Sequence, residues 1–365
     1  MKQNLSPGRE VIVAGGLNED IKARPFTAFT ARTSNPGRIY RAPGGVGRNI
    51  AHCLALLGSR SVLCSAAGND SAGRAAIEST AAAGVDTSAV ITYPQYQTGA
   101  YLAIQDEHGD LSAAVSSMEI MEALTPGQLA SIETRIIAAA ALILDTNLSS
   151  AALGYLAELA HRHRVPCIVE PVSVEKARRL APVLDYCSWI SPNIDELSAL
   201  FSINKTLIID AIRCAASTPG RACTIGTDMG AALDARSSAG PNPNILVTLG
   251  SRGLLLLSRN PQCPGQRALS SAAQKEPLPS TPGRWRAWWY PPLDTEVADA
   301  NGAGDAFLAG FTAAFTAQPA GERTGGLTVA DAIAWGQAAA AITLESQHTV
   351  AAELSRSAVR RRLAE

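Results

Sequence analysis

One short segment of the chain combines an acid with a glycine-rich turn directly before an apolar helical run. Residues 299–305 read DANGAGD. The small residues Gly302, Ala303 and Gly304 let successive N–H groups point at a ligand where a helix begins, which favours anion binding. Asp305 could accept the proton of a substrate hydroxyl while these donors stabilise a transferred phosphoryl group. The segment therefore predicts phosphoryl transfer; the alternative is a glycine-rich turn with an Asp N-cap.

The composition of the 365-residue chain excludes several classes of protein. Hydrophobic residues make up 47% of the sequence, which is enough for a sizeable core, and the formal net charge is -1. Because no block rich in Lys and Arg stands out, we expect no nucleic-acid partner. The apolar stretches are too short to span a membrane, and the N-terminus lacks the apolar core of a signal peptide. These features predict a cytoplasmic protein without a membrane partner.

The cysteines show no spacing that is typical of a metal site. The seven are Cys53, Cys64, Cys167, Cys187, Cys214, Cys223 and Cys263. Without CxxC pairs, neither zinc binding nor a disulfide framework is favoured, so we expect reduced thiols that lie mostly in the core.

Short strand-like runs alternate with alanine-rich helical runs over most of the chain. The strand-like runs include 11–14, 61–66, 141–144, 167–169 and 245–249. The helical runs include 49–57, 72–83, 151–161, 305–315 and 329–344. This alternation is typical of βαβ units. It predicts an α/β fold with a mainly parallel central sheet, formed as one domain over residues 1–365.

Four stretches depart from this alternation. Residues 21–41 are polar and strand-prone, and residues 98–117 hold two strand-like runs around a turn. We expect strands over about 18–42 and 97–118 to leave the main sheet and form a small β lid; the alternative is two surface hairpins without function. Segments of about 217–244 and 260–284 are rich in Ser, Pro, Gly and Ala, which predicts partly disordered surface insertions.

A second glycine-rich segment, PGGVGRN at 43–49, precedes an apolar helical run. Its glycines permit close approach of the backbone to a ligand, and Asn49 offers both a donor and an acceptor. Together with Asp20 and the segment 299–305, it resembles the PfkB (ribokinase-like) family of sugar and nucleoside kinases. That family carries a GG motif near the N-terminus and a D-x-x-G-A-G-D motif near the C-terminus.

Two further motifs extend the resemblance over nearly the whole chain. NIDE at 193–196 matches the N-x-x-E element of the family, and VTLGSRG at 247–253 matches its nucleotide-binding strand and loop. The resemblance implies a ribokinase-like three-layer α/β/α sandwich with a small β lid. It also implies that Asp305 is the general base and that Gly302, Ala303 and Gly304 form the anion hole.

The resemblance assigns further residues to the phosphoryl acceptor. Those implied to hold the hydroxyl groups of a sugar are Asp20, Gly44, Gly45, Asn49 and Asn147. A vicinal diol suits this set because a carboxylate accepts while amides and backbone groups donate. Glu170 follows a strand-like run, where an acid in an α/β fold belongs either to the site or to the exposed surface.

The resemblance also assigns residues to the phosphoryl donor. Those implied to bind ATP are Asn193, Thr248, Gly250, Gly253 and Gln337. Glu196 would bind Mg²⁺ through water, since a carboxylate is a hard oxygen ligand. Asp299 resembles part of a monovalent-cation site, which implies activation by K⁺. Read alone, the 193–196 segment after a proline is an ordinary helix N-terminus.

Within the family, the segments SNPGRI (34–39) and PGGVGRNIA (43–51) are most similar to those of pseudouridine kinases. This implies transfer of a phosphoryl group from ATP to the 5'-hydroxyl of pseudouridine. Glu170 departs from the Asp common in those kinases, and another acceptor (ribose, a ketohexose or another nucleoside) is the open alternative. A nucleoside-binding protein without turnover is a second alternative.

An oxidoreductase is disfavoured because Gly15-Gly16 is not part of a GxGxxG motif. The family also implies a homodimer made by the lids.

Overall fold

The computed structural model describes residues 9–108, 110–217, 222–236, 243–260, 285–317 and 327–365. The predicted α/β fold is confirmed. Among the described residues, the larger sheet has ten strands in the order β11-β14-β13-β12-β10-β9-β8-β1-β4-β5. The segment from β12 to β5 is parallel throughout, whereas β13, β14 and β11 pair antiparallel. These strands are β1 (Val11–Ala14), β4 (Ser61–Gly68), β5 (Asp86–Tyr93), β8 (Ala141–Asp145), β9 (Cys167–Glu170), β10 (Trp189–Ile190), β11 (Cys223–Thr224), β12 (Asn244–Thr248), β13 (Leu254–Ser258) and β14 (Arg286–Tyr290).

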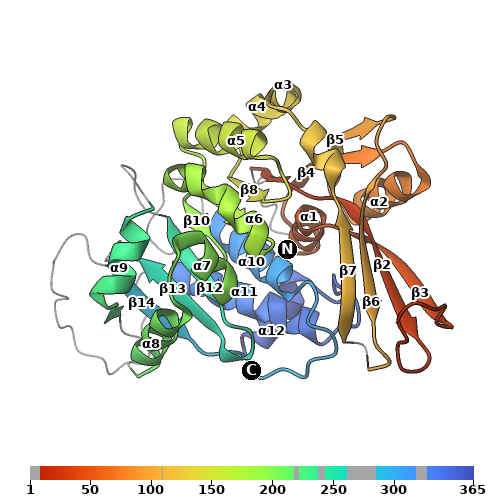
Figure 1. The fold of residues 1–365 in the computed structure, drawn as a ribbon. Coiled ribbons are helices and arrows are strands. Elements are labelled where there is room, and N and C mark those ends of the chain that lie inside the picture. Colours follow the sequence, from red (N-terminus) through yellow and green to blue (C-terminus); the bar gives the residue numbers. More distant parts are fainter. Residues whose placement is uncertain (1–8, 109, 218–221, 237–242, 261–284, 318–326) are drawn as a thin grey trace.

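Apolar residues on both faces of the strands place helices on both sides of the sheet. In β1, Ile12 and Ala14 pack into one core, whereas Val11 and Val13 pack into the other. A central parallel strand is buried on both faces, which explains its continuous run of apolar residues. The result is the predicted three-layer sandwich (Figure 1).

The helices divide between these two cores. Those with residues in the first core are α3 (Pro126–Leu129), α4 (Glu133–Ala138), α5 (Ser150–Arg162), α7 (Ile194–Phe201), α8 (Lys205–Ala216) and α9 (Thr227–Asp234). Those with residues in the second core are α1 (Val46–Leu56), α2 (Ser71–Ala82), α10 (Ala303–Thr316), α11 (Val329–Leu344) and α12 (Arg356–Arg362). The short helix α6 (Val174–Ala177) follows β9.

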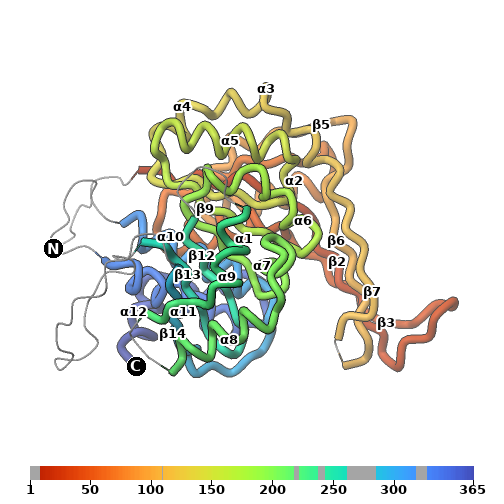
Figure 2. Tube along the Cα trace, turned by 60° about the vertical axis from the view of Figure 1, so that its left-hand side comes forward, coloured from red at the N-terminus to blue at the C-terminus, as the bar shows by residue number. Residues whose placement is uncertain are grey.

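A smaller four-stranded sheet extends from the side of the main body, as Figure 2 shows. Its strands, in spatial order, are β3 (Gly37–Gly44), β2 (Asn18–Pro25), β6 (Gly99–Gln105) and β7 (Leu111–Ser117). Residues that face one another in register lie on the same side of a sheet. One face carries Asp20 and Lys22, while the other carries Ile21 and Leu102.

Within the surface insertion expected over 217–244, the described residues include a strand and a helix. Residues 223–224 form β11 at the edge of the large sheet, and helix α9 buries Met229 and Leu233 against it. The sequence expectation failed because two apolar side chains one helical turn apart are a weak signal in an alanine-rich segment. Most of the other expected insertion, 260–284, lies outside the described residues.

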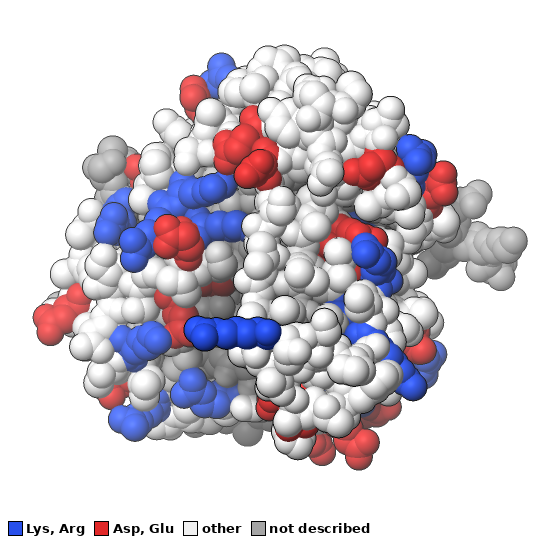
Figure 3. All heavy atoms as spheres, turned by 45° about the vertical axis from the view of Figure 1, so that its right-hand side comes forward, with Lys and Arg blue, Asp and Glu red and all other residues white. Residues whose placement is uncertain are grey.

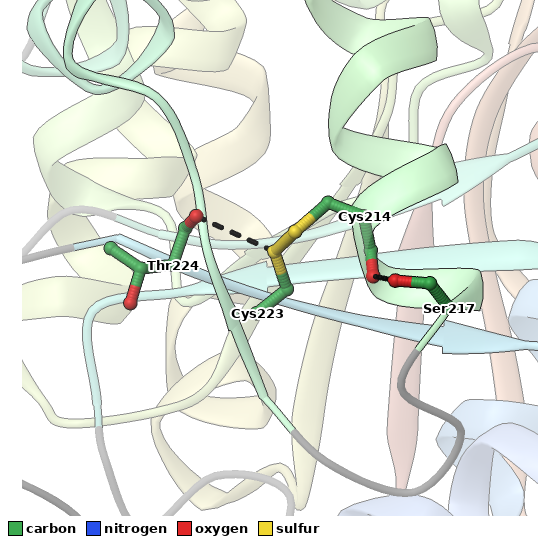
Figure 4. Close-up of a disulfide and its surroundings, with 4 residues drawn as sticks. All are labelled: Cys214, Ser217, Cys223 and Thr224. Carbon is green, nitrogen blue, oxygen red and sulfur yellow. Dashed lines mark hydrogen bonds between the residues drawn. A yellow bond between two sulfur atoms is a disulfide. The ribbon is translucent and has the colours of Figure 1, made fainter.

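A disulfide between Cys214 and Cys223 corrects the expectation that all cysteines are reduced thiols. It joins the end of α8 to β11, as Figure 4 shows. The sequence alone could not pair these residues, because they lie nine positions apart without a recognisable motif. Four other cysteines, at 53, 64, 167 and 187, are free and buried, as predicted.

Two further observations concern membrane-spanning helices and surface charge. In the part of the chain that the structure describes, no helix is both long and apolar enough to cross a membrane. Figure 3 shows basic and acidic side chains mixed over the face that it presents, which carries no uniformly basic surface.

Candidate active site

Helix α10 begins at a glycine that no other residue could replace without strain. Gly302, the N-cap, has a φ of 81°, and a Cβ there would lie 1.9 Å from the carbonyl oxygen of Thr349. A Cβ on Gly304, by contrast, would meet nothing within 4 Å. The first turn of α10 therefore faces open space, where its N–H groups can bind an anion.

Asp305 lies in this first turn and contacts helix α1. The side-chain amide of Asn49 donates a hydrogen bond to Asp305 Oδ2 over 2.9 Å. Burial raises the pKa of Asp305 to about 7; the Asn49 hydrogen bond opposes this rise, and the nearby carboxylates of Asp145 and Asp20 add to it. A carboxylate whose pKa is near neutrality is well suited to accept a proton from a hydroxyl group.

Asp20 lies beside the glycine pair that was predicted to bind the acceptor. Asn18 Nδ2 donates to Asp20 Oδ1 over 2.7 Å, and burial raises the pKa of Asp20. A Cβ on Gly44 would lie 2.3 Å from the carboxyl carbon of Asp20, so a side chain there would displace the Asp20 carboxylate. Gly45 has a φ of 102° and is the N-cap of α1. The carboxylate, the two glycines and Asn49 thus converge on one end of α1.

Arg48, which the sequence analysis did not select, fixes the orientation of Asn49. Its guanidinium donates to Asn49 Oδ1 over 3.2 Å and to Thr80 Oγ1 over 3.2 Å. Because the Asn49 oxygen accepts from Arg48, the Asn49 nitrogen is left to donate to Asp305. The position of Arg48 within the GGVGRN segment could have marked it as a candidate. The sequence of that segment does not, however, predict the direction of the arginine side chain.

Asn147 is held by a lysine that the sequence analysis also missed. Lys176 Nζ, from α6, donates to Asn147 Oδ1 over 2.6 Å. A Cβ on Gly16 would lie 2.8 Å from Asn147 Nδ2, so this amide nitrogen packs against the residues that follow β1. Burial lowers the pKa of Lys176, and the charge of Asp145 opposes that shift.

Glu170 lies at the end of β9 and interacts with several carboxylates of the site. Burial raises its pKa well above the ordinary value, and the charges of Glu196, Asp305 and Asp145 raise it further. Glu170 is half-buried and is therefore not the exposed acid of the alternative interpretation; its role in the site stays a prediction. Strand ends that meet at one edge of a parallel sheet bring such acids together.

The nucleotide residues predicted from the sequence are brought together only in part. A pocket of about 350 Å³ is lined by Asn193, Thr248 and Gly250, together with Lys205 and Arg252. Gly253, with a φ of 87°, makes the turn between β12 and β13, where a Cβ would lie 2.2 Å from the Tyr290 carbonyl oxygen.

The remaining nucleotide candidate lies on a late helix. Gln337, on α11, donates to the carbonyl oxygen of Pro291 over 2.7 Å. Neither Gly253 nor Gln337 belongs to the described lining of the 350 Å³ pocket.

The pair Asn193 and Glu196 forms a capping box at the start of α7. Asn193 N donates to Glu196 Oε2 and Glu196 N donates to Asn193 Oδ1, each over 2.9 Å. The 193–196 segment is therefore a helix N-terminus, as the alternative interpretation of its sequence predicted. The Glu196 side chain is buried, and one of its two oxygens accepts the hydrogen bond from Asn193 N.

Asp299, the candidate ligand for a monovalent cation, already has partners. Lys22 Nζ from the lid lies 3.4 Å from its Oδ2, while the backbone and side-chain nitrogens of Asn301 donate to its Oδ1. Within the described residues, no group of three or more His, Cys, Asp and Glu side chains could hold a metal ion. Glu196 and Asp299 would each need oxygen ligands from the nucleotide, water or the backbone.

Comparison with known proteins shows the family to which the chain belongs. The family model for the pfkB family carbohydrate kinases matches residues 10–281 and 286–355. The chain belongs to the PfkB family. Two curated relatives with similar extent are pseudouridine kinases, one from Escherichia coli (strain K12) and one from Arabidopsis thaliana. The first is 27% identical and the second 28%, and in each case the match covers 94% of this chain and 93% of the relative.

A solved structure extends the similarity to the fold. Arabidopsis thaliana ribokinase, complexed with ribose and ATP, superimposes with a TM-score of 0.72 at 18% identity. The match covers 98% of this chain and 99% of the ribokinase. The predicted ribokinase-like sandwich is thereby confirmed. The class of enzyme, a carbohydrate kinase, follows from the family match instead.

Proposed function

We propose that this PfkB kinase transfers the γ-phosphoryl group of ATP to the 5'-hydroxyl of pseudouridine, giving pseudouridine 5'-phosphate and ADP. The observation that carries the phosphoryl transfer is Asp305, held by Asn49 at the open N-terminus of α10. The choice of pseudouridine rests on the two pseudouridine kinases that match over nearly their full length.

In this proposal the acceptor lies between the lid and the end of α1. Asp20 accepts hydrogen bonds from the ribose hydroxyl groups, and the Gly44 and Gly45 backbone allows the sugar to approach closely. Asn147 adds an amide contact. Asp305 takes the proton of the 5'-hydroxyl as its oxygen attacks the γ-phosphorus, and the N–H groups at residues 302–304 stabilise the charge on the transferred group.

The donor site of the proposal lies at the carboxyl ends of β10 and β12. ATP would occupy the pocket lined by Asn193, Thr248 and Gly250. Mg²⁺ would be held by the ATP phosphates and, through water, by Glu196, and would neutralise phosphate charge there. Glu170 would lie between donor and acceptor, since it interacts with both Glu196 and Asp305.

Two further parts of the proposal concern the lid and a monovalent cation. The lid would close over the acceptor and exclude water, since Lys22 already reaches Asp299 beside the α10 turn. K⁺ would bind near Asp299 together with backbone carbonyl groups. Comparing turnover in K⁺ and Na⁺ buffers tests the cation, and equal rates would remove it from the proposal.

The lid sheet carries an apolar face that a second copy of the chain could cover. Ile39, Leu102 and Val115 lie on the face opposite Asp20, and their exposed fractions are 67%, 36% and 64%. Apolar patches of this kind mark interaction sites. We therefore propose a homodimer in which the lids pair through this face.

A single assay tests the proposed reaction. ADP release is measured with ATP, Mg²⁺ and pseudouridine, uridine, adenosine, ribose or fructose in parallel. The proposal expects the highest kcat/KM for pseudouridine. A higher value for another acceptor would keep the kinase and replace its substrate, whereas acceptor binding without ADP release would indicate the non-catalytic binding protein.

A further inference from the structure

A buried carboxylate next to the site makes hydrogen bonds that the proposed reaction does not use. Asp145 ends β8 and is fully buried. Its Oδ2 accepts from the backbone nitrogens of Gly16 over 2.7 Å and Gly47 over 2.8 Å, and its Oδ1 accepts from the backbone nitrogen of Asn147 over 2.8 Å. Burial raises the pKa of Asp145, but both oxygens act as acceptors, and these hydrogen bonds favour the ionised form.

Each of these three donors belongs to a different segment that carries an acceptor-binding residue. Gly16 lies between β1 and β2, the strand of Asp20. Gly47 lies in the first turn of α1, two residues before Asn49. Asn147 is itself a candidate contact. One carboxylate thus joins the ends of β1 and β8 to the start of α1.

The backbone packs closely around Asp145 at Gly15 and Gly47. A Cβ on Gly15 would lie 2.4 Å from Asp145 Oδ2, and a Cβ on Gly47 would lie 2.8 Å from the carbonyl carbon of Gly15. Arg48 N also donates to Gly16 O over 3.0 Å. Bare glycines allow the two backbones to approach the carboxylate closely, which a side chain on either would prevent.

We propose that Asp145 is a positioning residue for the phosphoryl acceptor: by binding the three backbone N–H groups it sets the positions of Asn49, Asn147 and the start of the lid relative to Asp305. The proposal rests on the kinase reaction proposed above but not on pseudouridine as its substrate. It adds a role for a residue that touches neither the acceptor nor ATP.

The charge of Asp145 gives the proposal a second consequence. Asp145 is among the acids that raise the pKa of Asp305. The titratable groups that interact with Asp305 across the site are Asp20, Cys53, Asp145 and Glu170. Removing the Asp145 charge alone should lower the pKa of Asp305, so the rising limb of the pH–rate profile should move to lower pH.

The test is steady-state kinetics of D145N with the acceptor that the wild-type chain phosphorylates fastest. The amide keeps the shape of the carboxylate but presents an N–H₂ group to at least one of the backbone donors. The KM for the acceptor should rise about 10- to 100-fold, the range for lost hydrogen bonds to a charged group, while the KM for ATP stays within about twofold. The rising limb should move to lower pH.

Two variants separate positioning from a general loss of stability. Ser258, buried at the end of β13, bonds to Asn244 and Asn260, so S258A removes two partly buried hydrogen bonds in the other half of the sheet. It should lower the Tm and leave both KM values unchanged. D145E keeps the charge but displaces it, so the acceptor KM should rise without a shift of the pH profile. This variant also tests the positioning role if D145N does not fold.

An unchanged acceptor KM in D145N, or an equal rise of both KM values, would overturn the positioning role. Failure of the proposed reaction gives a different result, because the wild-type chain would then release no ADP with any acceptor. In that case, calorimetric titration of wild type and D145N with pseudouridine and with ribose still tests positioning. Equal affinities would overturn it.

Discussion

At the scale of single residues, the proposed reaction depends most on Asp305. A substitution of this buried acid should affect turnover and stability in different ways. D305N should reduce kcat by about 10²- to 10⁴-fold through loss of the general base. Its Tm should stay the same or rise, because the amide is not penalised by burial as a charge is. Both are measured on one preparation by ADP release and thermal unfolding. Near-normal turnover would contradict the role of Asp305.

The pKa of Asp305 also predicts how rate and stability depend on pH. Only the ionised form can accept a proton, so kcat/KM should rise about tenfold per pH unit below about 7 and level off above it. The folded state binds the proton more tightly than the unfolded state, whose ordinary pKa is 3.8. The contribution of Asp305 to stability therefore falls as pH rises from 3.8 to about 7, and D305N should remove this part. A pH–rate profile with its midpoint near 4 would contradict this prediction.

At the scale of elements, the first turn of α10 offers a matched pair of glycine substitutions. G302A places a side chain at a φ of 81° and against the Thr349 carbonyl oxygen, so it should cost at least about 1–2 kcal/mol of unfolding free energy. G304A should be neutral or stabilising, because its Cβ enters open space on a helix.

Both substitutions should nevertheless reduce turnover, since the open space at Gly304 is where the transferred phosphoryl group is proposed to lie. Urea unfolding and ADP release on the two variants separate these effects. If G304A kept full activity, the anion site would not lie at the start of α10.

At the scale of the whole molecule, the exposed apolar face of the lid predicts the oligomeric state. V115K puts a charge into the proposed lid–lid interface and should convert a dimer into a monomer in sedimentation experiments. Val297, also 64% exposed but outside the lid, provides the matched control, because V297K should leave the dimer intact. A wild-type chain that sediments as a monomer would exclude the lid dimer.

Local patterns in the sequence were sufficient for much of the architecture. The alternation of apolar runs predicted the α/β sandwich, because strands and helices bury apolar side chains at different spacings. The run of polar, strand-prone residues around Asp20 predicted strands outside the main sheet. The DANGAGD segment predicted the start of a helix with an acid in its first turn, since that geometry is set by residues adjacent in the chain.

The sequence by itself therefore determined the family and the fold, and it pointed to the segment for which we propose a catalytic role. Only the tertiary structure decided which groups hold the candidate site residues in place: the Arg48–Asn49–Asp305 contacts, the Lys176–Asn147 bond and the three hydrogen bonds of Asp145. The Cys214–Cys223 disulfide is likewise a contact that only the tertiary structure revealed. Most of these contacts join residues far apart in the chain, and the direction of a long or buried polar side chain depends on neighbours that no local pattern specifies.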